Sequence, residues 1–211
     1  EHAPASISKM TIMKIKHMIA VSLLLLTGIR TANAVEWQMK QGPMMTPWSE
    51  TLDPENVLGE YTRPQMERQE WMNLNGIWDL RKAIQDEAYS PDFIYDKKIL
   101  VPFPLESAIS GVMEESDNQC YWYRRTLTIP ESMKGKNILL HFDAVDWEAI
   151  VYVNGKKVGK HTGGYDPFYF DITSALKQDG EQELAVYVRD NTGAEGQPKG
   201  KQALNKWGCW Y

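Results

Sequence analysis

Short runs of alternating apolar and polar residues, separated by turn signals, fill the chain from Trp71 to Asp190. Such alternation indicates strands, because successive side chains of a strand point to opposite faces. The expected strands are 77–82, 98–101, 119–129, 137–142, 148–153, 168–172 and 183–190. One face of each strand should enter a shared core and the other should meet water. Residues expected in that core include Trp78, Leu140, Val151 and Val188.

Turn residues punctuate these strands. Asn154-Gly155 lies between Val151–Val153 and Lys156–Val158, which predicts a β-hairpin with a two-residue type I′ turn. Asn75-Gly76 and Asp179-Gly180 mark two further turns. Residues 174–177 are expected to form a single helical turn. Short strands at close spacing, without a convincing amphipathic helix or a fixed internal repeat, predict an all-β antiparallel sandwich.

The first 34 residues have the order of a secretory signal peptide. Lys14 and Lys16 precede an apolar run, 18–26, and Ala32-Asn33-Ala34 supplies a small-residue cleavage pattern. The run is too short to cross roughly 30 Å of hydrocarbon, so no membrane anchor is expected after cleavage behind Ala34. Residues 35–70 follow as an irregular, proline-containing lead-in. The strands then occupy 71–190.

Composition narrows the classes of partner. The net charge is -5 and no basic patch suits phosphate binding, so a nucleic-acid partner is not expected. Eight Trp and ten Tyr suit either burial in sheet faces or stacking on sugar rings, and the sequence leaves both readings open. Cys120 and Cys209 could pair in an exported protein, although two buried thiols are the favoured interpretation.

The sequence contains few candidate catalytic or metal-ligating groups. His141 and His161 stand apart in sequence, without Cys or paired carboxylates at ligand spacing, which favours structural or surface histidines. Neither a metal nor a cofactor is expected. Glycosidases use two carboxyl groups, and the chain has many, but no local pattern singles out a pair. No catalytic residue is therefore assigned.

Six motifs follow one another along the chain: Trp71–Asp79, Val101–Ser107, Trp122–Pro130, His141–Asp146, Val151–Gly155 and His161–Phe168. The first is similar to W-x-x-L-N-G-x-W, the opening of the sugar-binding sandwich of glycoside hydrolase family 2, the β-galactosidase and β-glucuronidase family. The others resemble motifs of the same domain and stand in the same order. Each motif alone is weak, but their order and spacing together are specific. The resemblance covers about residues 60–211.

This resemblance implies a jelly-roll-like sandwich of the galactose-binding-domain type. In the family, an immunoglobulin-like domain and a TIM barrel with both catalytic glutamates follow it. Residues 191–211 would lead towards those domains, and we expect the chain to stop before the barrel. The lead-in 61–66 and the segment 200–202 are similar to exported enzymes of Bacteroidota, which implies a periplasmic or secreted, Gram-negative protein.

The sequence is compatible with three functions. The first is the N-terminal sugar-binding domain of an exported β-glycosidase, inactive by itself and packed on its own downstream domains. The second is a free-standing carbohydrate-binding module or lectin. The third is a structural or interaction sandwich without affinity for sugars. About two dozen residues follow the last expected strand, and such an extension favours the first.

The resemblance also implies which residues would face a β-linked glycoside. In family members, the segment after the last sandwich strand runs towards the barrel mouth. Polar groups there can hydrogen-bond sugar hydroxyls and indole rings can stack on a sugar. The predicted substrate-binding residues are Asp190, Asn191, Lys201, Gln202, Trp207 and Trp210. The alternative is that Asp190 and Asn191 only begin a turn and that the Trp residues fill an interface between domains.

Overall fold

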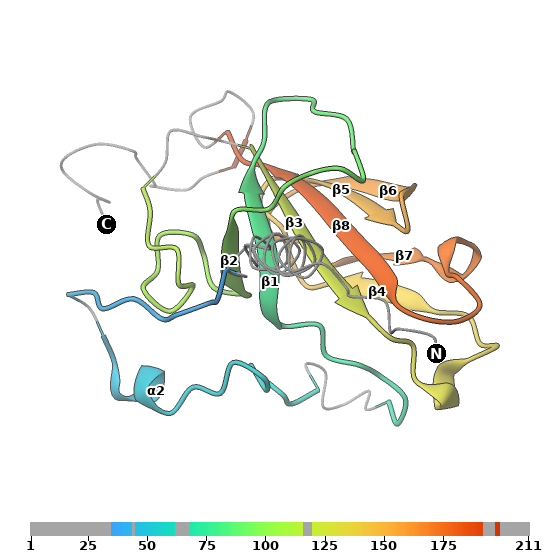
Figure 1. Ribbon diagram of the computed structural model, residues 1–211, viewed down its shortest axis with the longest axis horizontal. Coiled ribbons are helices and arrows are strands. Elements are labelled where there is room, and N and C mark those ends of the chain that lie inside the picture. The colour runs from blue at the N-terminus through green and yellow to red at the C-terminus, as the bar shows by residue number, and fades with distance from the viewer. Residues whose placement is uncertain (1–34, 44, 62–67, 116–119, 192–196, 199–211) are drawn as a thin grey trace, which may run out of the picture. The chain divides into compact units, whose positions relative to one another are not determined.

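The computed structural model describes residues 35–43, 45–61, 68–115, 120–191 and 197–198. The predicted signal peptide lies outside the described residues. Nearly all of the regular secondary structure in the described part is strand (Figure 1). Its elements are α2 (Pro47–Glu50), β1 (Gly76–Lys82), β2 (Lys97–Val101), β3 (Cys120–Leu127), the 3-10 helix η2 (Glu131–Met133), β4 (Leu139–Phe142), β5 (Glu148–Val153), β6 (Lys156–Thr162), β7 (Phe168–Asp171), the 3-10 helix η3 (Thr173–Ala175) and β8 (Gln182–Arg189).

The strands form two antiparallel sheets. The larger has six strands in the order β2-β1-β3-β8-β5-β6, and the smaller pairs β4 with β7. The longest pairing joins β3 to β8 over eight residues, from Cys120 opposite Arg189 to Leu127 opposite Gln182. The prediction of an all-β antiparallel sandwich is confirmed. The expected helical turn at 174–177 is present one residue earlier, as η3.

Side chains that alternate along the strands fill the space between the sheets. Trp78, Leu140 and Val151 are buried, as predicted, while Val188 is only partly buried against the same cluster. The core is largely aliphatic, with Leu80, Ile99, Ala149, Val153, Leu184 and Val186 among its members. The period of two therefore identified this core correctly.

The smaller sheet packs closely on the larger one because β6 carries a glycine at the contact. A Cβ atom on Gly159 would lie 2.0 Å from the ring of Phe170 in β7. The Phe170 ring also contacts Phe168 edge-on, with centroids 5.6 Å apart. Phe168 stacks in turn on Phe142 of β4. Glycine at 159 thus lets the aromatic rings of the second sheet reach the backbone of the first.

The other face of the larger sheet was expected to meet water, and for its centre this expectation is wrong. Residues 83–96, the connection between β1 and β2, run across that face (green in Figure 1). Trp122 is fully buried beneath the connection and contacts the rings of Tyr89 and Phe93. The buried residues Ala83, Cys120, Ala185 and Tyr187 complete this second cluster. We call this arrangement the outer cover.

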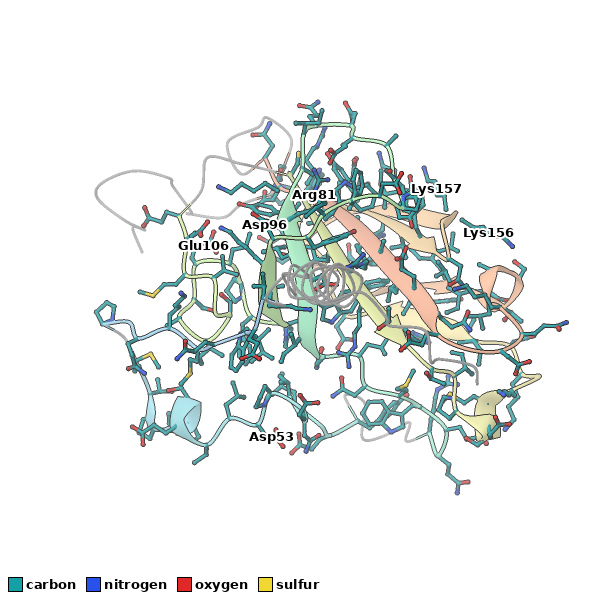
Figure 2. The ribbon with its side chains drawn as sticks, viewed as in Figure 1. Asp53, Arg81, Asp96, Glu106, Lys156 and Lys157 are labelled. Atoms are coloured by element: carbon teal, nitrogen blue, oxygen red, sulfur yellow. The ribbon has the colours of Figure 1, made fainter. Side chains whose placement is uncertain are left out.

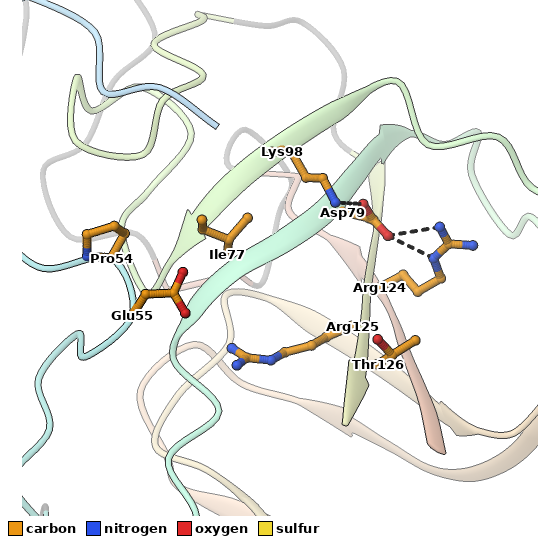
Figure 3. A pocket seen from close by; sticks show the side chains of 8 residues that line it. All are labelled: Pro54, Glu55, Ile77, Asp79, Lys98, Arg124, Arg125 and Thr126. Carbon is orange, nitrogen blue, oxygen red and sulfur yellow. Dashed lines mark hydrogen bonds and ion pairs between the residues drawn. The ribbon is translucent and has the colours of Figure 1, made fainter. Parts of the chain in front are cut away.

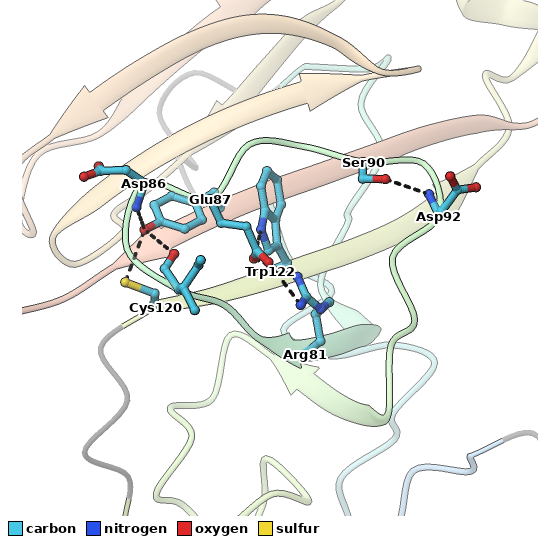
Figure 4. A network of polar contacts seen from close by, with 9 residues as sticks. Arg81, Asp86, Glu87, Ser90, Asp92, Cys120 and Trp122 are labelled. Carbon is cyan, nitrogen blue, oxygen red and sulfur yellow. Dashed lines mark hydrogen bonds and ion pairs between the residues drawn. The ribbon is translucent and has the colours of Figure 1, made fainter.

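Polar contacts fasten the outer cover to the sheet (Figure 4). Glu87 accepts two hydrogen bonds from the Arg81 guanidinium, at 2.8 and 3.2 Å, and one from the Trp122 indole at 2.9 Å. The Tyr187 hydroxyl accepts a hydrogen bond from the backbone N–H of Asp86 and contacts the Cys120 sulfur at 3.2 Å. These partners come from a loop, from β1 and from the two central strands, so the cover is part of the folded unit. Cys209, the other cysteine, lies outside the described residues.

The β5–β6 hairpin ends the larger sheet at one edge. Asn154 and Gly155 have φ values of 49° and 77°, which confirms the predicted type I′ turn. Beyond the turn, β6 carries Lys156 and Lys157 at its start, on the hairpin at the free edge (Figure 2). Charged lysines on an edge strand oppose pairing with another chain, which explains why this open edge is tolerated.

The lead-in adheres to loops of the sandwich. Trp37 donates an indole hydrogen bond to the Ser110 carbonyl at 2.8 Å, and the Asn73 amide donates to the Val57 carbonyl at 2.9 Å. Val57 is buried. Apart from α2, the described residues between 35 and 75 contain no regular element.

Candidate functional site

The end of β8 brings together two segments that are far apart in the sequence. Glu148 of β5 lies opposite Arg189 of β8, and the Trp147 backbone N–H donates to the Arg189 carbonyl at 3.2 Å. Asp146, which lies just before Trp147, and Asp190, which follows Arg189, are therefore neighbours at this end of the sheet. The antiparallel register alone determines this pairing, because one strand begins where its neighbour ends.

A third segment, after β6, reaches the same end. The Gly163 backbone N–H donates to the Trp147 carbonyl at 2.9 Å. A Cβ on Gly164 would lie 2.5 Å from the Asp146 carboxyl oxygen, so any larger residue would displace the carboxylate. Because residue 164 is glycine, the Asp146 carboxylate can lie against the backbone of this loop.

The described residues beyond β8 contact this end as well. The Gln197 amide donates to the Asp190 carboxylate at 2.5 Å, and Gln197 itself is buried. The Tyr165 hydroxyl lies 3.5 Å from the Pro198 carbonyl, while 64% of Tyr165 remains exposed. An exposed aromatic ring thus lies near hydrogen-bonded polar groups at this end of the sheet.

The electrostatics of the two aspartates are coupled. Partial burial of the Asp146 carboxyl raises its pKa, and the negative charge of Asp190 raises it further. An ionised carboxylate accepts hydrogen bonds through both of its oxygens, so the two aspartates can accept from the hydroxyl groups of a ligand. We call Asp146, Gly164, Tyr165, Asp190 and Gln197 the strand-end cluster.

The histidines and charged side chains on the neighbouring strands have partners outside the strand-end cluster. The His161 ring stacks on Phe168 with centroids 4.1 Å apart, in agreement with a structural role for this histidine. Lys160 pairs with the buried carboxylate of Glu148 at 2.6 Å. His141 lies on the smaller sheet, 5.3 Å from the Tyr169 ring. Within the described ranges, no group of three or more His, Cys, Asp or Glu side chains could hold a metal ion.

The structure places two of the six predicted substrate-binding residues. Asp190 and Asn191 follow β8 at the strand-end cluster. Lys201, Gln202, Trp207 and Trp210 lie outside the described residues, so these assignments stay predictions.

The cluster also contains residues that were not assigned to a site from the sequence. Asp146, Gly164 and Tyr165 belong to the motifs 141–146 and 161–168, but their convergence depends on strand register. No local sequence pattern around Gln197 assigns it to a binding site. In the described part of the chain, no helix has the length and apolar character needed to cross a membrane.

Comparison with known proteins decides the family. A family model described as "Glycosyl hydrolase 2 galactose-binding domain-like" matches residues 93–209, more than half of the chain. The chain belongs to this family. The resemblance inferred from the ordered motifs is thereby confirmed, and so is the galactose-binding-like type of the sandwich.

Relatives of this glycosyl hydrolase 2 domain are much longer proteins. A β-galactosidase of Thermoanaerobacter pseudethanolicus is 35% identical over 133 residues, which cover 61% of this chain and 18% of that protein. A β-glucuronidase of Bacteroides fragilis is 42% identical over 73 residues, 35% of this chain and 10% of that protein. The chain thus spans less than a fifth of either relative.

A solved structure shares the same domain. The crystal structure of a Bacteroides uniformis β-glucuronidase superposes with a TM-score of 0.51 and 31% identity, over 63% of this chain and 16% of that one. The chain is accordingly the N-terminal domain of the β-galactosidase and β-glucuronidase family.

Proposed function

We propose that this domain works within an exported β-glycosidase, where its strand-end cluster contacts the sugar while downstream domains perform hydrolysis of the O-glycosidic bond. The observation that carries the proposal is the convergence of Asp146, Asp190 and Gln197 where the chain leaves the last strand. Two carboxylates, an amide and the exposed Tyr165 ring offer the acceptors, donors and apolar face that a carbohydrate needs.

Kinetics of the longer protein that contains this domain test the role of the cluster. Asp190→Ala should lower kcat/KM on the β-glycoside substrate at least about tenfold, since the carboxylate proposed to accept hydrogen bonds from the sugar hydroxyls would be lost. Asp179→Ala is the matched control, because Asp179 lies 84% exposed in the turn before β8. A loss below about threefold for Asp190→Ala, or ~0.7 kcal/mol, would remove the cluster from the site.

The proposal also covers activity and export. The 211-residue chain by itself should hydrolyse no aryl glycoside, and sustained turnover by the purified chain would overturn this part.

Expression with residues 1–34 intact should yield a periplasmic or secreted protein whose N-terminus is Val35, as read by mass spectrometry. A protein that retained the leader in the cytoplasm would contradict export.

A further inference from the structure

Two aspartates of the domain, Asp79 and Asp190, receive hydrogen bonds from side chains of different charge. Asp79 of β1 accepts from Lys98 at 2.5 Å and from Arg124 at 2.8 and 3.0 Å (Figure 3). The Arg124 guanidinium also lies 4.2 Å from the centre of the Tyr95 ring. Two cations offset the charge of this carboxylate and join β1 to β2 and β3, which assigns Asp79 a structural role.

Asp190 receives a hydrogen bond from a neutral group. The side-chain amide of Gln197 donates to Asp190 Oδ1 at 2.5 Å, and Gln197 is buried. An amide donor orients a carboxylate without cancelling its charge, because the amide carries no charge of its own. The hydrogen bond therefore fixes Oδ1 and, with it, the direction of the second oxygen, Oδ2.

Asp190 needs such a contact because a second carboxylate lies nearby. Burial and the negative charge of Asp190 raise the pKa of Asp146, so the two acids repel each other when both are ionised. Asp146 has little room on the side of the loop after β6, where a Cβ on Gly164 would lie 2.5 Å from its carboxyl oxygen. Repulsion would turn the Asp190 carboxylate away from Asp146, and the hydrogen bond from Gln197 opposes that rotation.

The segment that carries Gln197 also reaches the loop after β6. The Tyr165 hydroxyl lies 3.5 Å from the Pro198 carbonyl, and the Tyr165 side chain remains largely exposed. Gln197 and Pro198 thus contact the end of β8 and this loop at once. A sugar ring that stacks on an aromatic face presents its hydroxyls at the ring edge, so the placement of Asp190 relative to Tyr165 sets which hydroxyl can meet the carboxylate.

We propose that Gln197 is a positioning residue for substrate binding, whose amide orients the Asp190 carboxylate towards the hydroxyls of a sugar at the strand-end cluster. Gln197 acts through Asp190, because it is buried and its amide already donates to that carboxylate. This positioning role rests on the proposed function, in which Asp190 contacts the sugar.

Kinetics of the longer protein that contains this domain test the positioning role. Gln197→Leu keeps the approximate shape but removes the donor, and should raise KM for the β-glycoside substrate about fivefold with kcat within about twofold. A merely structural role would reduce the folded fraction, and hence kcat, without raising KM. Gln85→Leu is the matched control, because the amide of the exposed Gln85 also donates to an aspartate, Asp86, at 3.4 Å. The control should leave KM and kcat unchanged.

A double-mutant cycle distinguishes this role from the proposed function. In the Asp190→Ala background, Gln197→Leu should change kcat/KM by less than about twofold, because the group that it positions is gone. An equal loss in both backgrounds would overturn the positioning role. If Asp190→Ala lowered kcat/KM but Gln197→Leu did not raise KM, only the positioning role would be wrong. If Asp190→Ala itself had no effect, the proposed contact with the sugar would be wrong as well.

The hydrogen bond can also be observed in the 211-residue chain, without any activity. By NMR, the side-chain amide of Gln197 should exchange its hydrogens at least about tenfold more slowly than that of the exposed Gln85. Asp190→Ala, folded by circular dichroism, should abolish this protection. Equal exchange of the two amides in the unchanged chain would overturn the positioning role, because no lasting hydrogen bond would then hold Asp190.

Discussion

The two faces of the six-stranded sheet are covered in different ways. The inner face carries aliphatic side chains such as Leu80 and Val151 and packs against the smaller sheet. The outer face is covered at its centre by one loop, through aromatic rings and charged side chains around Trp122. An aliphatic interface needs only an apolar pattern, whereas the outer cover also needs each polar group to find its partner. The difference shows that a loop can contribute to the core of a sheet domain.

The largest expected effect is on the outer cover. Trp122→Ala should lower the free energy of unfolding by about 3–5 kcal/mol, because the side chain is fully buried among Tyr89, Phe93, Tyr152 and Tyr187. Urea unfolding measures the change. Leu80→Ala on the inner face should cost a similar amount, about 2–5 kcal/mol. A cost below about 1 kcal/mol for Trp122→Ala, typical of surface positions, would show that the loop packs only loosely.

The inner face can be tested at the contact between the two sheets. Gly159→Ala should destabilise by about 1–3 kcal/mol, because the new methyl group would overlap the Phe170 ring. Thermal unfolding gives the cost. Adding Phe170→Leu to this variant should cost less than the sum of the two single changes, since the smaller side chain relieves the overlap. If the changes in the free energy of unfolding were strictly additive, the side chain at residue 159 would not clash with the Phe170 ring.

A smaller effect is expected from one hydrogen bond of the outer cover. The Tyr89 hydroxyl donates to the Glu183 carboxylate at 2.5 Å, and burial together with Glu183 raises the pKa of Tyr89. Tyr89→Phe should therefore lower stability by about 1.5 kcal/mol, as for hydrogen bonds to charged groups. Tyr169→Phe is the control, because Tyr169 is 60% exposed on the smaller sheet. If Tyr89→Phe and Tyr169→Phe changed the free energy of unfolding by the same amount, the hydrogen bond to Glu183 would not stabilise the outer cover, and only apolar contacts would hold it on the sheet.

The smallest effect concerns the strand-end cluster, which belongs to neither face. The pKa of Asp146 is raised in the folded state, so ionisation of Asp146 opposes folding. This cost is absent below the unfolded pKa, about 3.9, and complete above the folded pKa. Asp146→Asn should raise Tm at about pH 7 and leave it unchanged near pH 3, where both states are protonated.

The gain should stay below about 1 kcal/mol, because the Asp146 carboxyl is only partly buried and water still reaches the residue and screens its charge. Asp143→Asn, nearby on the same connection, controls for a general change in net charge. A gain from Asp146→Asn that was equal at both pH values would contradict the raised pKa of Asp146 in the folded state.

Local patterns in the sequence determined the strands, the hairpin at Asn154-Gly155 and the aliphatic core. These features depend on side-chain periodicity and on turn chemistry, which neighbouring residues specify by themselves. The ordered motifs identified the family, because each motif is likewise a pattern of neighbouring residues. Only the tertiary structure decided that Trp122 is buried on the supposed water face, because its cover comes from a loop without periodicity. Likewise, Asp146, Asp190 and Gln197 converge only through strand register and long-range packing. Such contacts join residues that are distant in sequence, and no local preference encodes them.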